Sequence, residues 1–250
     1  MRWRPVYFRY FFIIMRPLRL IIFDLDGTLV DAYEAITKSF NYTMHALGYP
    51  RQKSLVIRRA VGWGDAGLLK PFVEEKDLKK ALLVYRRHHA QALKTKAGSR
   101  LLPYAGFLLA RLKAQGYSLA IASNRPTRFS LLIIRHLKIQ QYFAYVLCAD
   151  TLTRGKPDPE ILTTIMKKLS VAREETLYVG DMTIDAKTGN AAKVKTVIVT
   201  TGSSSKAEIK KYWLGKTIIN SNHRFTYEEV QEIIEIKDGL YKDEILALNS

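Results

Sequence analysis

The chain has 250 residues, of which 48% are hydrophobic and 25% charged, an ordinary composition for a globular protein. A single cysteine, Cys148, excludes an internal disulfide framework and a zinc site built from cysteines. The net charge of +17 attracts anions, but no nucleic-acid-binding motif accompanies it. We therefore expect a small acidic molecule as the partner, with a polyanion as the weaker alternative.

Residues 1–17 form a predicted N-terminal extension that is basic and rich in apolar side chains. The run from Val6 to Met15 resembles part of a signal peptide, but it contains Arg9 and no small-residue cleavage site follows it. At about ten residues it is too short to span a bilayer. Either the segment lies on a membrane surface or packs on the domain, or Met15 is the natural start. In both cases we expect a cytoplasmic protein without a transmembrane segment.

The first predicted strand, residues 18–24, leads into two carboxylates, Asp24 and Asp26, within the string DLDGTL. Side chains alternate along a strand, so both carboxylates point the same way if the extended run continues through them. Gly27 allows a sharp turn. Two like charges side by side repel, so we expect a bound cation or a shared reaction to offset the repulsion. The alternative is a strand end followed by an ordinary Asp-Gly turn.

Residues 31–100 show helical periodicity and no strand pattern. Helices are predicted over 32–48 and 75–95, and the loop over 61–67 contains three glycines. Because this stretch separates the first strand from the second, we predict an inserted, all-helical cap domain over 31–100.

Strands and helices alternate after residue 100. We predict strands over 117–123, 144–150, 176–181 and 194–200, a possible last strand over 215–220, and helices over 106–116, 127–138, 159–170, 184–193 and 226–236. Repeated strand–helix units predict the α/β class, with a doubly wound parallel sheet covered on both faces. The core domain then comprises residues 18–30 and 101–250.

Polar side chains stand at the ends of several predicted strands. They are Asp24 and Asp26, Ser123 and Asn124, Asp181 and Asp185, with Lys156 in the loop RGKPDPE. In a doubly wound sheet, ligands bind outside the carboxyl ends of the strands. We therefore expect these side chains to form one site.

Four motifs in this order, DLDGTLVD, IASN, GKPDPE and GDMTIDA, resemble those of the haloacid dehalogenase (HAD) superfamily, in its phosphoglycolate phosphatase-like branch with a helical cap. The resemblance covers residues 18 to about 236 and implies a Rossmann-like core. It implies that Asp24 is a nucleophile that forms an aspartyl-phosphate. Asp26 would protonate the leaving oxygen and then activate the hydrolytic water. Dehalogenases and phosphonatase-like members lack this second aspartate, so Asp26 favours a C–O–P substrate.

The resemblance also implies Mg²⁺ as the cofactor. The metal ligands would be Asp24, Asp181 and the backbone carbonyl of Asp26, with Asp185 in support. The phosphate would be bound by Thr28, Ser123, Asn124 and Lys156, and Ser123 and Lys156 would also take part in catalysis. A carboxylate-rich site suits Mg²⁺, which prefers oxygen ligands.

The cap should select the substrate, because the core contacts only the phosphate. Its candidate residues are Arg58, Arg59, Gly62, Trp63 and Gly64. Trp63 either closes over a ligand or packs inside the cap. His88 and His89 lie on a charged helix, and we expect them to be solvated rather than catalytic.

These patterns predict a Mg²⁺-dependent phosphatase for a small phosphorylated metabolite. Phosphoglycolate is the first substrate to test, and nucleotides, sugar phosphates and pyrophosphate stay open. One alternative is a phosphomutase of the same fold. Another is a non-catalytic binding protein, which would have no need for the acid Asp26.

Overall fold

The computed structural model describes residues 18–95, 98–212 and 218–219. The predicted N-terminal extension, residues 1–17, and the predicted helix over 226–236 lie outside the described residues.

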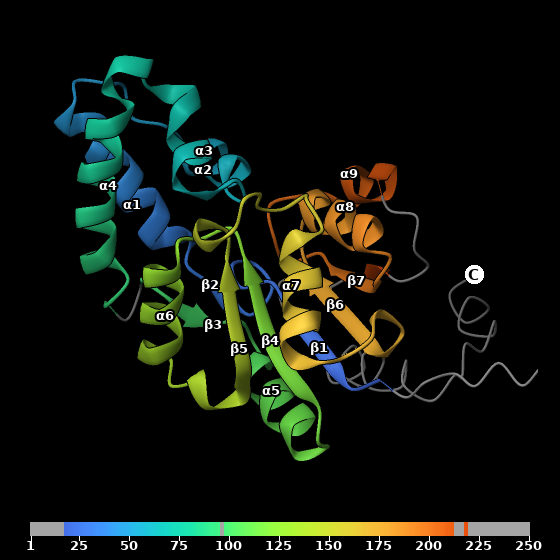
Figure 1. Cartoon of the computed structure of the whole chain (residues 1–250). Helices are drawn as coiled ribbons and strands as arrows, with labels where there is room; N and C mark the ends of the chain where they lie inside the picture. The colour runs from blue at the N-terminus through green and yellow to red at the C-terminus, as the bar shows by residue number, and fades with distance from the viewer. Residues whose placement is uncertain (1–17, 96–97, 213–217, 220–250) are drawn as a thin grey trace, which may run out of the picture.

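A parallel six-stranded sheet in the order β5-β4-β1-β6-β7-β8 forms the centre of the molecule (Figure 1). Its strands are β1 (Leu20–Phe23), β4 (Ser118–Ser123), β5 (Phe143–Cys148), β6 (Thr176–Gly180), β7 (Lys195–Val199) and β8 (Ile218–Ile219). The side chains of β1 are all buried, as expected for the central strand of a parallel sheet. Each predicted core strand is therefore present.

Helices cover both faces of this sheet. The core helices are α5 (Ala105–Ala114), α6 (Thr127–His136), α7 (Glu160–Leu169), α8 (Thr183–Ala192) and α9 (Lys206–Tyr212). Ile21 and Phe23 of β1 pack in the cluster that includes α5 and α6, whereas Leu20 and Ile22 pack in the cluster that includes α7. This alternation confirms the predicted doubly wound α/β class.

Helices α1 (Tyr33–Ala46), α2 (Ser54–Ala60), α3 (Gly64–Leu69) and α4 (Leu78–Ala92) form a separate lobe beside the sheet (Figure 1). They share their own apolar cluster, in which Phe40, Met44 and Tyr85 are buried. We keep residues 31–100 as the proposed extent of this cap.

Two short strands that the sequence did not predict join the cap to the core. They are β2 (Val30–Asp31) and β3 (Arg100–Leu101), which pair antiparallel. Arg100 Nη2 lies 2.7 Å from Asp31 Oδ2, so an ion pair accompanies the pairing. The chain therefore leaves and re-enters the core at adjacent positions.

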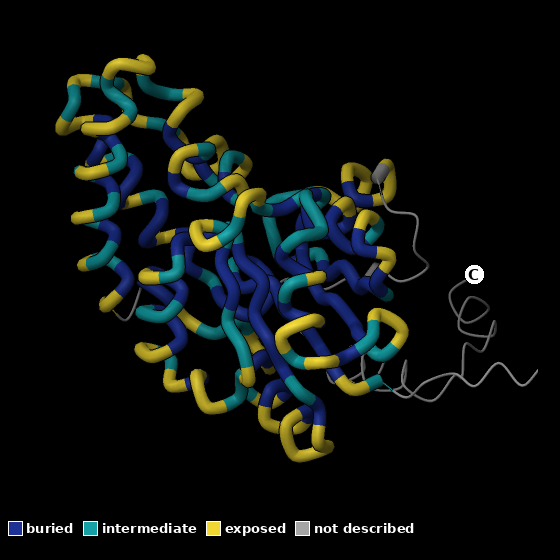
Figure 2. The backbone as a smooth tube through the Cα atoms, viewed as in Figure 1, coloured by how far each residue is buried: buried dark blue, intermediate teal, exposed yellow. Residues whose placement is uncertain are grey.

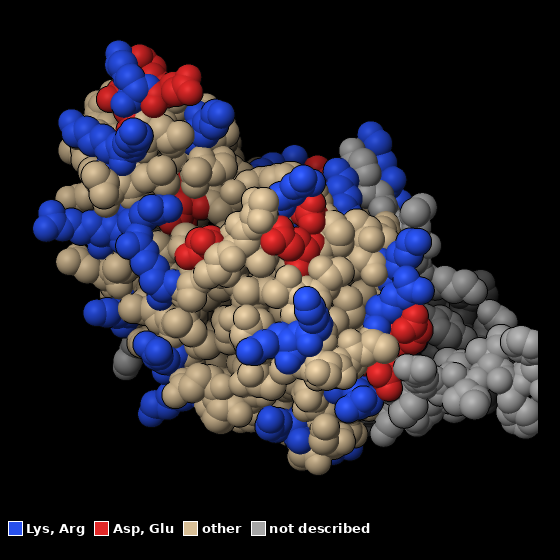
Figure 3. All heavy atoms as spheres, in the orientation of Figure 1, with Lys and Arg blue, Asp and Glu red and all other residues tan. Residues whose placement is uncertain are grey.

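Buried residues lie inside the two lobes, and most charged residues lie on their surfaces. The strands are buried, and exposed segments lie at the turns and on the outer faces of the helices (Figure 2). Lys and Arg side chains spread over the outer surface of both lobes (Figure 3). Within the part of the chain that the structure describes, no helix combines the length and the apolar character needed to cross a bilayer.

Candidate functional site

The carboxyl ends of the central strands converge on one site. Asp24 follows β1, Ser123 ends β4 and Asp181 follows β6. Phe23, the last residue of β1, pairs with Ile121 on one side and with Val179 on the other. This register brings the residues after these strands to the same edge of the sheet.

Lys156 is the buried centre of an ion-pair network at this edge. Its Nζ lies 2.7 Å from Asp24 Oδ1 and 2.8 Å from Asp185 Oδ1. Although burial alone would lower it, Asp185 and Asp24 raise the pKa of Lys156 above its usual value. Tyr178 also donates a 2.5 Å hydrogen bond to Asp185 Oδ1. The lysine is therefore charged and fixed in place.

The Asp24 carboxyl is the second group of this network. Burial, offset in part by the charge of Lys156, raises its pKa to about 6. A carboxyl in this range is ionised at neutral pH, as a nucleophile must be.

Asp181 has an unbonded oxygen that suits a cation. Its Oδ1 accepts a 2.8 Å hydrogen bond from Thr28, but its Oδ2 is buried and has no partner among the described residues. A Cβ on Gly27 would lie 2.5 Å from this Oδ2, and one on Gly202 would also collide with it. The two glycines therefore leave the space that the carboxylate needs.

Three carboxylates meet here with one lysine. Oxygen atoms of Asp24, Asp181 and Asp185 lie within 4.8 Å of one another. Burial, together with the charges of Asp24 and Asp185, raises the pKa of Asp181 well above its usual range. A divalent cation would balance the charge left after Lys156 is counted, and an all-oxygen donor set fits Mg²⁺.

Asp26 lies in a different network, which sequence reasoning missed. Both of its carboxylate oxygens accept 2.7 Å hydrogen bonds from the buried guanidinium of Arg125. Arg125 Nη1 lies 2.7 Å from Nε2 of His89 on the cap helix α4. Arginine cannot accept, so this Nε2 accepts and the imidazole proton is on Nδ1. His89 is buried, so the expectation that it is solvated is wrong.

Ser123 and Asn124 line the same pocket as Asp24. Ser123 Oγ accepts a hydrogen bond of 3.1 Å from the backbone N–H of Arg125. Asn124 Nδ2 donates to the carbonyls of Gly62, at 2.9 Å, and of Lys156, at 3.0 Å. Asn124 thus joins the cap to the core. Thr28 contacts Asp181, as described above, so its hydroxyl holds a predicted metal ligand.

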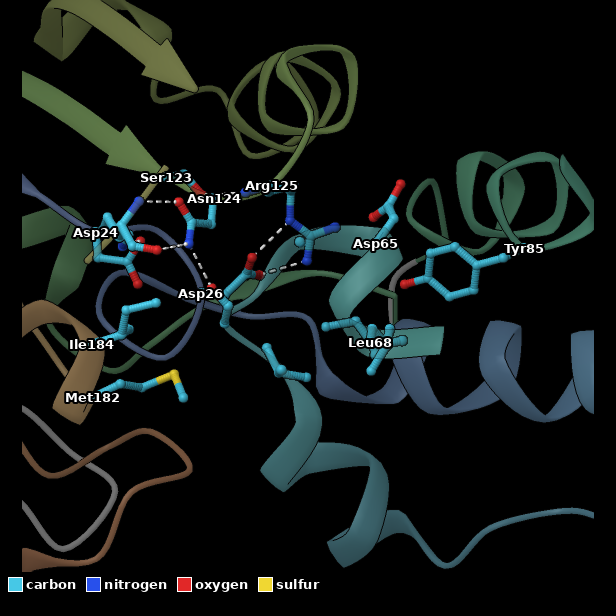
Figure 4. Close-up of a pocket in the computed structure, with 15 residues that line it drawn as sticks. Asp24, Asp26, Asp65, Leu68, Tyr85, Ser123, Asn124, Arg125, Met182 and Ile184 are labelled. Atoms are coloured by element: carbon cyan, nitrogen blue, oxygen red, sulfur yellow. Dashed lines mark hydrogen bonds and ion pairs between the residues drawn. The ribbon is translucent and has the colours of Figure 1, made fainter. Parts of the chain in front are cut away.

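A pocket between the cap and the core joins these groups. Figure 4 shows Asp24 at one end, Asp26 and Arg125 between, and Asp65 and Tyr85 at the other end. The lining residues are Asp24, Asp26, Ile36, Val61, Gly62, Gly64, Asp65, Leu68, Tyr85, Ser123, Asn124, Arg125, Lys156, Met182 and Ile184.

The structure divides the predicted cap candidates into two groups. Gly62 and Gly64 line the pocket, but Arg58, Arg59 and Trp63 are not among its lining residues. Trp63 is 53% exposed, so it does not pack inside the cap, and its closing over a ligand stays a prediction. Arg59 lies 3.7 Å from Glu208 in an exposed ion pair. Arg58 Nη2 donates to the carbonyl of Thr201 at 3.0 Å and that of Gly202 at 3.2 Å.

Three polar or charged lining residues were missed, for different reasons. Arg125 directly follows Ser123 and Asn124, so its position at a strand end was a signal that could have been used. Asp65 lies inside the glycine-rich loop, from which only the glycines and the tryptophan were predicted as candidates. Tyr85 sits on a helix without any distinguishing pattern, so no sequence signal marked it.

Comparisons with known proteins agree with this geometry. A sequence model of a family described as haloacid dehalogenase-like hydrolase matches residues 21–199. The phosphoglycolate phosphatase of Rhodobacter capsulatus is 33% identical over 186 residues, which cover 73% of this chain and 84% of that protein. Phosphoglycolate phosphatase 1 of Pseudomonas aeruginosa is 30% identical over 200 residues, 76% of this chain and 72% of that protein.

The chain also resembles a solved structure. A crystal structure described as a predicted phosphoglycolate phosphatase from Haemophilus somnus has a TM-score of 0.78 and 25% identity, and the match covers 89% of this chain and 99% of that one.

Proposed function

The chain belongs to the haloacid dehalogenase-like hydrolase family and is a phosphatase of phosphoric monoesters, and we propose that it works through an aspartyl-phosphate on Asp24, with Mg²⁺ bound beside it. One observation carries this proposal. The Asp24 carboxylate is bound by the buried Lys156 and lines the pocket that also contains Asp26. Near it lies the Asp181 oxygen that has no hydrogen-bond partner among the described residues.

Asp24 attacks phosphorus in the first step, and the bond from phosphorus to the leaving alkoxide breaks. Covalent catalysis of this kind divides one difficult step into two easier ones. Lys156 keeps the attacking carboxylate oriented and lies close enough to stabilise the charge on the phosphoryl oxygens. Ser123, beside it in the pocket, is the proposed hydroxyl contact to the same oxygens.

Asp26 supplies the proton for the leaving oxygen. To do so, its carboxyl must carry a proton and release one of its two hydrogen bonds from Arg125. In the second step the same carboxylate takes a proton from water, which attacks the aspartyl-phosphate and restores Asp24. A well-placed proton donor is worth roughly 10²–10⁴-fold in rate.

Asp24 and Asp181, with the backbone carbonyl of Asp26, would hold the Mg²⁺, and Asp185 would support the site. The bound ion would neutralise charge on the phosphoryl group and fix it for in-line attack. Removal of the ion by a chelator should therefore abolish turnover, and added Mg²⁺ should restore it.

Phosphoglycolate is the first substrate to test, because the matched relatives are named for it. A phosphomutase of the same fold and a pyrophosphatase remain the alternatives. Release of inorganic phosphate from a panel of phosphorylated metabolites, with and without Mg²⁺, separates these activities. A mutase would interconvert sugar phosphates without releasing phosphate.

Two substitutions test the assigned roles of the aspartates. Asp24→Asn removes the nucleophile, so nitrophenyl phosphate should be turned over only at the background rate. Asp26→Asn keeps the nucleophile, and nitrophenol needs little protonation to leave. This variant should release a burst of about one nitrophenol per enzyme and then turn over slowly, because the aspartyl-phosphate accumulates.

Stopped-flow absorbance measures the burst, and the parent enzyme in excess chelator is the control. A burst from Asp24→Asn would contradict the proposed nucleophile. Equal sensitivity of Asp26→Asn and the parent to the leaving group would contradict the proposed acid.

A further inference from the structure

The cap end of the pocket has a charge opposite to that of the cap as a whole. Residues 31–100 contain 14 basic and 6 acidic side chains. The cap nevertheless contributes one charged side chain to the pocket lining, that of Asp65. The remaining cap lining is apolar or glycine, apart from the hydroxyl of Tyr85. Among the described lining residues, the one charged side chain that the cap presents to a substrate is therefore acidic.

Both basic side chains of the lining already have acidic partners. Lys156 binds Asp24 and Asp185, and Arg125 binds Asp26 through two nitrogens while its third contacts His89. Arg86 pairs with Asp65 but is not among the lining residues. In the described part of the pocket, a second anionic group on the substrate would meet no basic side chain without an acidic partner.

Asp65 is placed to accept a hydrogen bond from a ligand. Its side chain is 7% exposed, and Arg86 Nε holds its Oδ2 at 2.9 Å. Its Oδ1 accepts no hydrogen bond from the residues that the structure describes. Tyr85 lies next to it, with the hydroxyl directed toward the pocket (Figure 4). A carboxylate and a phenol together suit a ligand hydroxyl, which both donates and accepts.

We propose that Asp65 selects a phosphate ester whose alcohol half is uncharged and bears hydroxyl groups, as in a small polyol phosphate, and disfavours one that bears a carboxylate, as phosphoglycolate does. This proposal rests on the phosphatase activity proposed above and defines its substrate class. A substrate hydroxyl would donate to Asp65, whereas a substrate carboxylate would be repelled by it in a poorly solvated pocket.

The matched pair of probes is 2-hydroxyethyl phosphate and phosphoglycolate, which share a two-carbon skeleton and differ in a hydroxymethyl group against a carboxylate. Glycerol 3-phosphate is the polyol probe. Phosphate release with Mg²⁺ gives kcat/KM for each, and the ratio within one variant is independent of the fraction of active enzyme. The parent should favour both hydroxylated esters over phosphoglycolate by at least about tenfold.

Two substitutions should move this ratio in opposite directions. Asp65→Asn removes the repelling charge, so discrimination against phosphoglycolate should fall roughly tenfold. Arg86→Met leaves Asp65 without its counter-charge, so discrimination should increase. A purely structural disturbance at this contact would move both ratios in the same direction.

Preference of the parent for phosphoglycolate, or an unchanged ratio in Asp65→Asn, would overturn this proposal while leaving the phosphatase intact. Turnover of nitrophenyl phosphate by the parent separates the two ideas. Its absence in the presence of Mg²⁺ would overturn the proposed function and the substrate class with it.

Discussion

His89 is a neutral histidine buried between the cap and the core. Burial, with the nearby charge of Arg125, lowers its pKa to about 2. It stacks on Tyr85 at 5.0 Å between ring centroids, and its Nδ1 lies 3.3 Å from Ser39 Oγ. A protonated imidazole could not accept the hydrogen bond from Arg125. A fall in pH should therefore weaken the contact between Arg125 and His89.

We expect the stability of the folded chain to depend on His89 below neutral pH. The folded pKa lies below the usual value of about 6.5, so the unfolded chain binds more protons between these values. Stability is thus lost as the pH falls below about 6.5, with a contribution of up to about 1.4 kcal/mol per pH unit. In His89→Gln this contribution should vanish.

Urea unfolding of both chains between about pH 5 and about pH 7 measures the difference. The parent should lose stability on acidification more steeply than His89→Gln. Because every other titrating group is common to both, equal slopes would show that the imidazole is protonated in the folded state.

At the scale of the element, helix α2 links the cap to the core through hydrogen bonds. Arg58 lies over the ring of Tyr33, 4.2 Å from its centroid, and donates to two backbone carbonyls of the loop after β7. That loop holds Gly202 against Asp181. Arg58, expected to contact the substrate, is therefore better placed to link the cap to the end of the site where Asp181 lies.

Arg58→Met should destabilise the chain without changing its preference among substrates. It keeps an apolar stem over Tyr33 but removes two hydrogen bonds, so we expect a loss of about 1–2 kcal/mol in the free energy of unfolding. Arg59→Met is the neighbouring control, and its exposed ion pair should contribute less. Urea unfolding and kcat/KM ratios check both parts. A changed substrate ratio in Arg58→Met would return this residue to the substrate site.

The elements differ in how far the sequence could predict them. The core strands are short apolar runs, each separated by a helix, and this pattern is local. Strands β2 and β3 are two residues long and pair only because the cap brings residue 100 back to residue 31. Because the core pattern is local, Asp24 and Asp181 could be placed at strand ends and Lys156 in the loop RGKPDPE. The contacts of Arg125 with His89, and the position of Asp65, depend on how the cap packs on the core.

At the scale of the whole molecule, the described contacts of the core begin at Leu18. Leu18 packs against the main cluster, and backbone hydrogen bonds to the sheet start at Arg19, which donates to the carbonyl of Glu175 at 2.8 Å. Residues 1–14 precede all of these contacts.

A chain that starts at Met15 should therefore keep both its melting temperature and its turnover. Thermal unfolding followed by circular dichroism, together with hydrolysis of nitrophenyl phosphate, makes the comparison. For a protein of this size, 1 kcal/mol corresponds to roughly 2–4 °C. A drop of more than about 5 °C would show that the removed segment packs on the body of the protein.

The central position of β1 affects the order of events during synthesis. Its two neighbours pair Leu20 with Ser118 and with Thr176, so they leave the ribosome roughly 100 and 150 residues after it. At 5–20 residues per second, the strand Leu20–Phe23 waits about 5–20 s with no partner on either edge, and about 8–30 s before its second edge can pair. A newly made apolar strand with two open edges is a template for wrong pairing. The nascent chain is therefore most vulnerable to aggregation before β6 emerges, and a chaperone that binds short apolar segments would act in that interval.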